Sequence, residues 1–351
     1  MKNQEKYIRR CIELAKNGLG KTYPNPMVGS VIVHNGRIIG EGWHKKAGQP
    51  HAEVNAVNSV KEEYRHLLKD STIFVSLEPC SHFGKTPPCA NLIVNHGIKK
   101  VVIGIIDSNS LVSGRGVSIL EENGHEVEFG SLQEECYDLN KRFFTFQNKK
   151  RPYIILKWAA SEDGFLDQNR EVNSKEEAKP NWITNAYSRQ LVHKWRTEEQ
   201  AILVGTTTVL KDNPSLTSRD WKGNNPVRVV LDRSLKIPQD YQVYNREVKT
   251  IILTEKEKES DEILCFEKID FDQPIAKQIC DILYKHNLQS LIVEGGKRTL
   301  ETFAKENLWD ETRIFHGEVQ FFDGVKEIEI KGKLMEERMI DEDNLKIYYN
   351  K

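Results

Sequence analysis

Apolar residues in the first half of the chain alternate between helical and strand spacing. Residues 8–15 carry apolar side chains every three or four positions, which predicts a helix. Residues 28–33 and 37–43 predict a β-hairpin, because the Asn35-Gly36 dipeptide between them suits a tight turn with positive φ at both positions. Further helices are predicted over residues 51–68 and 91–96, and buried strands over 72–77 and 100–105.

The same alternation restarts in the second half. Strands are predicted over residues 153–158, 201–204, 227–231, 251–253 and 291–293, and helices over 187–195, 275–286 and onward from 297. Alternating strands and helices predict two α/β domains. The polar, basic stretch 147–151 precedes Pro152 and has no apolar period, so we expect domains over residues 1–147 and 148–351.

Composition narrows the classes of partner. The 351 residues include 51 Lys+Arg and 52 Asp+Glu, giving a formal net charge of -1. This balance argues against a nucleic-acid or anionic-membrane partner, both of which favour excess positive charge. The sequence lacks an apolar run of the ~18 residues needed to span a bilayer, and the N-terminal residues lack a signal core. We therefore expect a cytoplasmic homo-oligomer that acts on a small molecule.

Four residues of the first half form a candidate zinc site. Zinc prefers imidazole nitrogen and thiolate sulfur, and a catalytic zinc has three protein ligands with a fourth position open to water. His51, Cys80 and Cys89 could supply these ligands. Glu53 lies two residues after the histidine at the predicted start of a helix, where its carboxylate could exchange protons with water that zinc activates.

Taken singly, these features are weak. Two cysteines nine positions apart are often ordinary buried thiols, and His-x-Glu occurs by chance. Jointly they match the signature of the zinc-dependent nucleobase deaminases, His-x-Glu followed by Pro-Cys and a second Cys. A structural zinc would need a fourth ligand, which His82 or His44 could supply, but neither explains Glu53.

Eight residues separate the two cysteines, where other deaminases of this kind have two. The surrounding segments are PNPMVG (24–29), GQPHAE (48–53), LEPCSH (77–82) and TPPC (86–89). In this spacing and these segments, the first half resembles the bifunctional deaminase/reductase family of riboflavin biosynthesis. The resemblance implies an N-terminal cytidine-deaminase-like α/β/α domain that binds one zinc ion. It also implies that the deaminase substrate contacts Asn25, His44, His82 and Lys85, although Lys85 could equally be a solvated loop lysine.

The resemblance covers nearly the whole chain and implies a reaction in two steps. The first domain would hydrolyse the 2-amino group of 2,5-diamino-6-ribosylamino-4(3H)-pyrimidinone 5′-phosphate, giving the aminouracil and ammonia. The second would be a dihydrofolate-reductase-like α/β domain that uses NADPH to reduce the ribosyl group to ribityl.

The resemblance assigns contacts in the second half residue by residue. Cofactor contacts are implied for Ala159, Trp182, Thr208, Asp212, Gly295 and Gly296, and substrate contacts for Arg196, Leu216, Arg219 and Glu294. A strand that ends in two glycines and opens a helix suits a diphosphate, since backbone N–H groups and the helix dipole favour an anion. Without the resemblance, the two glycines would indicate only a tight turn, and the two arginines only surface charges.

The chain departs from the family pattern in its reductase half. Glu162 replaces an apolar residue, Pro180 a small hydroxyl residue, and Lys297-Arg298 smaller residues, while residues 317–321 lack the family's proline. These changes bear on the reductase contacts and leave the zinc signature intact.

Two other functions use part of the same pattern. A tRNA or nucleobase zinc deaminase with a non-reductase second domain would share the zinc chemistry, but only residues 149–151 form a basic run. A zinc-stabilised binding protein whose second half docks a nucleotide would need no Glu53.

Overall fold

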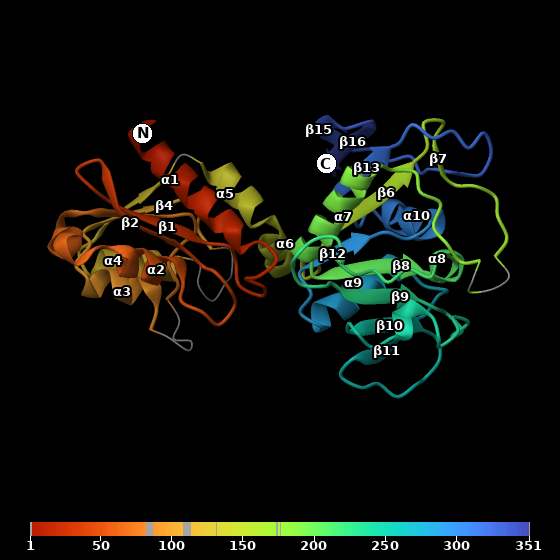
Figure 1. Cartoon of the computed structure of the whole chain (residues 1–351). Coiled ribbons are helices and arrows are strands. Elements are labelled where there is room, and N and C mark those ends of the chain that lie inside the picture. Colours follow the sequence, from red (N-terminus) through yellow and green to blue (C-terminus); the bar gives the residue numbers. More distant parts are fainter. Residues whose placement is uncertain are drawn as a thin grey trace. The chain divides into compact units, whose positions relative to one another are not determined.

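The computed structural model describes residues 2–81, 87–107, 114–130, 132–172, 175 and 177–350. The chain forms two compact units, residues 1–150 and 151–351, and each is described by itself (Figure 1). The boundary was expected after Gln147, within a linker. Instead helix α6 (Lys141–Lys149) continues through that stretch, and the first unit ends at Lys150. None of the described helices is long and apolar enough to cross a membrane.

Within its described residues, the first unit has a five-stranded sheet in the order β2-β1-β3-β4-β5. The first three strands in this order are antiparallel neighbours, whereas β3, β4 and β5 run parallel. The strands are β1 (Gly29–His34), β2 (Arg37–Trp43), β3 (Thr72–Val75), β4 (Lys100–Ile103) and β5 (Glu126–Phe129).

The predicted hairpin is present. His34 pairs with Arg37 across the turn, and the two turn residues Asn35 and Gly36 have φ of 45° and 79°. Positive φ at both central positions is the geometry that an Asn-Gly turn favours.

Helices cover both faces of this sheet, giving the expected α/β/α layers (Figure 1). α1 and α5 pack on one face around Val31, Phe74 and Val102, and α2, α3 and α4 pack on the other around Ile32 and Ile73. The helical elements are α1 (Lys2–Ala15), η1 (Lys16–Gly18), α2 (Ala52–Ser59), η2 (Glu62–Asp70), α3 (Cys89–Asn95), α4 (Arg115–Glu122), α5 (Gln133–Leu139) and α6.

The single helix predicted over residues 51–68 is wrong. The α-helix stops at Ser59, Val60 is extended, and a 3-10 helix follows. Val60 is buried and its side chain packs so closely on Gly40 that an added Cβ there would lie 2.5 Å away. Burial of Val60 against β2 therefore overrides the helical pattern.

The second unit, where described, has a nine-stranded sheet in the order β11-β10-β9-β8-β12-β6-β13-β16-β15. Neighbours from β11 to β13 are parallel, and β16 and β15 add antiparallel pairs. The strands are β6 (Tyr153–Ala160), β8 (Ala201–Gly205), β9 (Val227–Leu231), β10 (Thr250–Thr254), β11 (Leu264–Lys268), β12 (Ser290–Val293), β13 (Glu311–His316), β15 (Lys333–Ile340) and β16 (Asp343–Tyr349); β7 (Phe165–Asp167) and β14 (Val325–Lys326) pair separately.

Helices cover both faces of this sheet as well. α9 and α10 pack on one face and α7 and α8 on the other, each over a buried apolar cluster. The helical elements are α7 (Ala186–Glu198), α8 (Thr206–Asp212), η3 (Gln242–Tyr244), α9 (Ile275–Lys285) and α10 (Lys297–Lys305). Because β6, β8 and β12 are parallel, their carboxyl ends share one sheet edge, where ligands bind in open α/β sheets.

Candidate active sites

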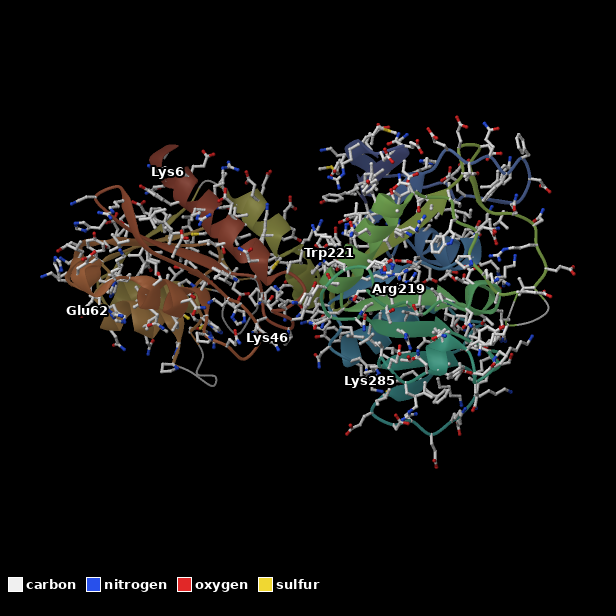
Figure 2. All side chains as sticks on the ribbon, in the orientation of Figure 1. Lys6, Lys46, Glu62, Arg219, Trp221 and Lys285 are labelled. Carbon is white, nitrogen blue, oxygen red and sulfur yellow. The ribbon has the colours of Figure 1, made fainter. Side chains whose placement is uncertain are left out.

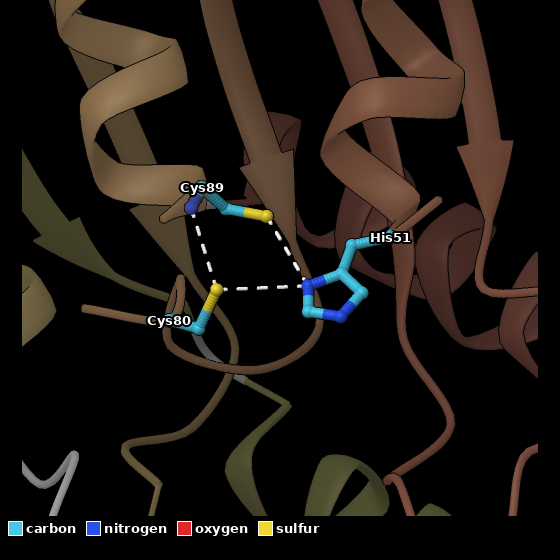
Figure 3. Close-up of side chains that lie close together, drawn as sticks. All are labelled: His51, Cys80 and Cys89. Carbon is cyan, nitrogen blue, oxygen red and sulfur yellow. Dashed lines mark hydrogen bonds between the residues drawn. The ribbon is translucent and has the colours of Figure 1, made fainter. Parts of the chain in front are cut away.

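The first unit brings His51, Cys80 and Cys89 together (Figure 3). His51 immediately precedes α2, Cys80 lies in the loop after β3, and Cys89 is the first residue of α3. The two Sγ atoms lie 3.6 Å (Cys80) and 3.4 Å (Cys89) from Nδ1 of His51. All three candidate ligand atoms lie within 4.8 Å of one another, so one ion can reach them all.

The chemistry of this donor set fits zinc. One imidazole nitrogen and two sulfurs are preferred zinc ligands, and among the described residues the group includes no fourth. A hydrogen bond from the Cys89 thiol is the main cause that lowers the pKa of Cys80 to about 4, and the same bond raises the pKa of Cys89. The backbone N–H of Cys89 also donates to Cys80 Sγ, at 3.3 Å. The resulting Cys80 thiolate is the form that binds a metal.

Glu53 lies in the first turn of α2 and is 3% exposed. Burial raises the pKa of its carboxyl to about 7, the charge of Cys80 adds to the rise, and His51 opposes it. A carboxyl in this position can both accept and return a proton near neutral pH. Its place beside the cluster, but outside the three ligands, is the one expected for a proton shuttle.

Asn25 and His44 lie beside the cluster. The Asn25 amide donates to Nε2 of His44 at 3.1 Å, and Nδ1 of His44 donates to the Pro50 carbonyl at 3.1 Å. Burial lowers the pKa of His44, which agrees with this neutral tautomer. The ring centres of His44 and His51 lie 5.2 Å apart, and the two rings are arranged edge to face. His82 and Lys85, the other expected deaminase contacts, lie outside the described residues.

The second unit has a cavity of about 1120 Å³ at the carboxyl ends of β6, β8 and β12. Every residue expected to contact cofactor or substrate in this half lines it. These residues are Ala159, Trp182, Arg196, Thr208, Asp212, Leu216, Arg219, Glu294, Gly295 and Gly296. Residues far apart in sequence thus meet in one place, although the lining does not assign a role to any of them.

A buried charge cluster lies at one part of this cavity. Arg196 donates twice to the Glu294 carboxylate, at 2.8 and 3.3 Å, and once to the Thr217 carbonyl at 3.0 Å. Burial acts to raise the pKa of Glu294, but the charges of Arg196 and Lys157 outweigh it and hold that pKa at about 2. Burial lowers the pKa of Lys157, although Glu294 opposes this.

The two glycines after β12 lie at the start of α10. The N–H of Gly296 donates to Thr208 Oγ1 at 3.0 Å, and no side chain caps the helix that follows. A Cβ on Gly295 would lie 2.6 Å from Cβ of Thr299, so only glycine lets the chain pass so close to α10. An open helix N-terminus beside Lys297 and Arg298 suits a phosphate group.

The remaining expected contacts differ in exposure. Trp182 is 56% exposed, with the Arg189 guanidinium stacked 4.7 Å from its ring centre. Arg219, labelled in Figure 2, is half-exposed, whereas Leu216 is buried with a strained φ of 55°. Asp212 is paired with Arg170 at 2.5 Å.

The residues that depart from the family pattern lie in different places relative to the cavity. Pro180, Lys297 and Arg298 line the cavity. Glu162 is not among its lining residues and instead accepts a hydrogen bond from Gln320 at 2.7 Å. Only the first three can therefore alter the cavity wall directly.

Sequence reasoning gave no role to Glu78, Lys157 or Arg170. Glu78 is a buried acid beside Cys80, Lys157 lines the cavity beside the Arg196–Glu294 pair, and Arg170 joins Asp212 to Asp167. A charged residue within an apolar strand segment was the one available signal for Lys157. The partners of Glu78, and Asp212 as a partner of Arg170, are distant in sequence.

Family comparisons divide the chain in the same way as the structure. Residues 1–105 match the cytidine and deoxycytidylate deaminase zinc-binding region, and residues 152–319 match the RibD C-terminal domain. Both fold expectations, a cytidine-deaminase-like first half and a reductase second half, are confirmed.

Individual relatives cover almost the whole chain. The riboflavin biosynthesis protein RibD of Aquifex aeolicus is 43% identical over 317 residues, covering 88% of this chain and 85% of the relative. The crystal structure of the Thermotoga maritima diaminohydroxyphosphoribosylaminopyrimidine deaminase/5-amino-6-(5-phosphoribosylamino)uracil reductase matches with a TM-score of 0.87 at 38% identity, covering 99% of both chains. RibD of Acinetobacter baumannii matches with a TM-score of 0.86 at 33% identity and the same coverage.

Proposed function

This chain belongs to the RibD family of bifunctional riboflavin-biosynthesis enzymes, and from that premise we propose that each of its units catalyses one step. The first unit hydrolyses the 2-amino group of 2,5-diamino-6-ribosylamino-4(3H)-pyrimidinone 5′-phosphate. The second unit then uses NADPH to reduce the ribosyl group of the aminouracil product to ribityl. The observation that carries this proposal is the convergence of His51, Cys80 and Cys89 beside the buried Glu53.

In the deaminase step, His51, Cys80 and Cys89 hold the zinc ion, which when bound supplies Lewis-acid activation of water. Glu53 accepts a proton from the attacking water as a carbon–oxygen bond forms at ring carbon C2. It returns that proton to the ring nitrogen. It then transfers the proton of the new hydroxyl to the amino group, which leaves as ammonia as the carbon–nitrogen bond breaks and the carbonyl forms. The burial of Glu53 excludes bulk water from this exchange.

The substrate of this step is held by Asn25 and His44, with His82 and Lys85 contributing from outside the described residues. The neutral His44 is fixed by Pro50 on one side and Asn25 on the other, so the two side chains present one defined hydrogen-bonding surface next to His51. Lys85 supplies positive charge for the ribose phosphate.

In the reductase step, NADPH supplies the hydride. We expect contacts to NADPH from Ala159, Trp182, Thr208, Asp212, Gly295 and Gly296, all of which line the cavity. The open start of α10 and the cations Lys297 and Arg298 favour its diphosphate. Asp212 also forms an ion pair with Arg170. Arg170 binds Asp167 as well, so it links the end of β7 to α8.

The reducible end of the substrate lies by the charge cluster. We expect Arg196, Arg219, Leu216 and Glu294, which all line the cavity, to contact the substrate, and Lys157 adds a second cation beside Glu294. Hydride goes to the ribosyl carbon bonded to nitrogen, the bond from that carbon to the ring oxygen opens, and a proton completes the new hydroxyl. Arg196 and Lys157 compensate the carboxylate of Glu294, which therefore stays ionised to accept hydrogen bonds from sugar hydroxyls.

The tRNA or nucleobase deaminase alternative is not favoured, because the second half matches a reductase domain. The expected homo-oligomer, the cytoplasmic location and the absence of nucleic-acid and membrane partners stay predictions. Light scattering of the purified chain would test the first, and fractionation of the native cell the second.

One experiment tests both steps. The purified chain is incubated with the diamino-pyrimidinone ribose phosphate, with and without NADPH, while ammonia and nicotinamide absorbance are followed separately. We expect ammonia in both reactions and NADPH consumption only after ammonia appears. Ammonia release without any NADPH consumption would contradict the proposed reductase step. The absence of both ammonia and NADPH consumption would contradict both steps.

A further inference from the structure

Glu78 stands two residues before the zinc ligand Cys80 and is 4% exposed. Its carboxylate accepts four backbone N–H groups. Oε2 accepts from Asp107 at 3.2 Å and Gly114 at 3.0 Å, and Oε1 accepts from Gly116 at 2.9 Å and Val117 at 3.4 Å. None of these partners lies within 28 residues of Glu78 along the chain.

Two of the four N–H groups, those of Gly116 and Val117, belong to the first turn of α4, and a third belongs to Gly114 just before it. Gly114 is the residue before this helix, has a left-handed φ of 74° and carries no side chain that could cap it. The first N–H groups of a helix have no partner within the helix and need an acceptor, and the helix dipole favours a negative charge there. Glu78 therefore caps the N-terminus of α4 with a side chain from a distant part of the sequence.

Backbone contact strengthens this connection. A Cβ on Gly116 would lie 2.1 Å from the Pro79 carbonyl oxygen and 3.1 Å from Oε1 of Glu78. Glycine is thus required for α4 to approach the peptide that precedes Cys80. The backbone N–H of Glu78 also donates to the carbonyl of Ile105, two residues after β4, at 2.9 Å.

Cys80 itself is held from the other side by α3. The N–H groups of Cys89 and Ala90 donate to the sulfur and the carbonyl oxygen of Cys80, at 3.3 and 3.2 Å. The segment 78–80 is therefore fixed between the N-termini of two helices, one binding Glu78 and the other binding Cys80.

We propose that Glu78 is a positioning residue for the deaminase site, which sets the place of the Cys80 thiolate by fastening the segment before it to α4 and to Asp107. The inference rests on the proposed zinc deaminase function. Groups that orient metal ligands from outside the first layer typically change metal affinity or activity about 10- to 100-fold when mutated.

The test is Glu78→Gln, which keeps the shape but turns one acceptor oxygen into a donor facing backbone N–H groups. Zinc affinity is measured by competition with a chromogenic chelator, and Co²⁺ loaded in place of zinc reports the thiolate ligands by its absorbance. We expect affinity to fall about 10- to 100-fold and the cobalt bands to shift, while NADPH-dependent reduction of the deaminated intermediate is unchanged. Glu122→Gln, an exposed acid at the end of α4, is the matched control and should behave as wild type.

A second variant disturbs the close approach of α4 to Pro79 but keeps the Glu78 carboxylate. Gly116→Ala should displace α4 from Pro79 and lower zinc affinity in the same direction. A purely structural Glu78 would lower the thermal midpoint while leaving affinity and cobalt spectrum as in wild type, and that result would overturn the inference. Loss of the folded first unit in both variants would overturn it too, since Glu78 would then be a folding determinant. Absence of metal binding and ammonia release in the wild-type chain would instead refute the proposed function.

Discussion

Arg196 and Glu294 form a two-point ion pair in the cavity of the second unit, with Nη2–Oε2 and Nε–Oε1 distances of 2.8 and 3.3 Å. Their side chains are 12% and 10% exposed, so neither charge can be hydrated fully if the other is removed. The pair connects α7, which carries Arg196, to the end of β12, where Glu294 precedes the two glycines.

Breaking this pair should damage stability and reduction together. We expect Glu294→Gln to destabilise the second unit by about 3 kcal/mol, because it leaves Arg196 buried without its counter-charge. The double variant Arg196→Met with Glu294→Leu should recover much of that stability but no reductase activity. Urea unfolding and NADPH oxidation measure the two effects. Reductase activity in the folded double variant would contradict the place given to this pair at the substrate.

Acid should weaken the second unit through Glu294. Its folded pKa of about 2 lies below the ordinary value of 4.5, so its ionisation stabilises the fold above that ordinary value. This stabilisation is lost as the pH falls from about 4.5 toward 2. In Glu294→Gln, the free energy of unfolding should therefore depend less on pH over this interval. Glu259→Gln, an exposed acid in the same unit, should keep the wild-type slope, and an equal slope in Glu294→Gln would refute the assignment.

The helices and strands that the sequence predicted correctly are those determined by residues close together in the chain. Asn35-Gly36 defined a hairpin by itself, and the buried β12 and β8 were visible as apolar runs. β15 was not predicted, because all but the last of its residues are exposed and its conformation depends on pairing with β16. The end of α2 was missed for a related reason, since it depends on the contact between Val60 and Gly40.

The same limit applies to the sites. His51, Glu53, Cys80 and Cys89 could be proposed because zinc chemistry restricts both residue type and order. The roles of Glu78 and Arg170 depend on partners that only the fold brings close, such as Gly116 and Asp212. For Arg196, a sequence cannot distinguish a buried ion pair from a solvated surface charge.

Glu53→Gln should separate the two activities. The glutamine fits the same space but cannot accept and return a proton, so kcat for ammonia release should fall about 100- to 10,000-fold. Reduction of the deaminated intermediate should continue at the wild-type rate, because the described residues that line its cavity all belong to the second unit. Each rate is measured on its own substrate. Loss of both activities in a folded variant would contradict independent sites.

Cysteine replacement tests the metal directly. Cys89→Ser removes one of the three clustered ligands, and the buried oxygen that replaces it is a poorer zinc ligand. We expect the zinc content to fall from about one ion per chain to a small fraction of that, with ammonia release lost in parallel and NADPH oxidation retained. Cys265→Ser changes a half-buried cysteine of the second unit and serves as the control. Prolonged chelation of the wild-type chain should reproduce the Cys89→Ser pattern, and added zinc should restore ammonia release only where Cys89 is intact. Full deaminase activity in metal-free Cys89→Ser would refute a zinc mechanism, since no other group of described residues brings three such ligand atoms together.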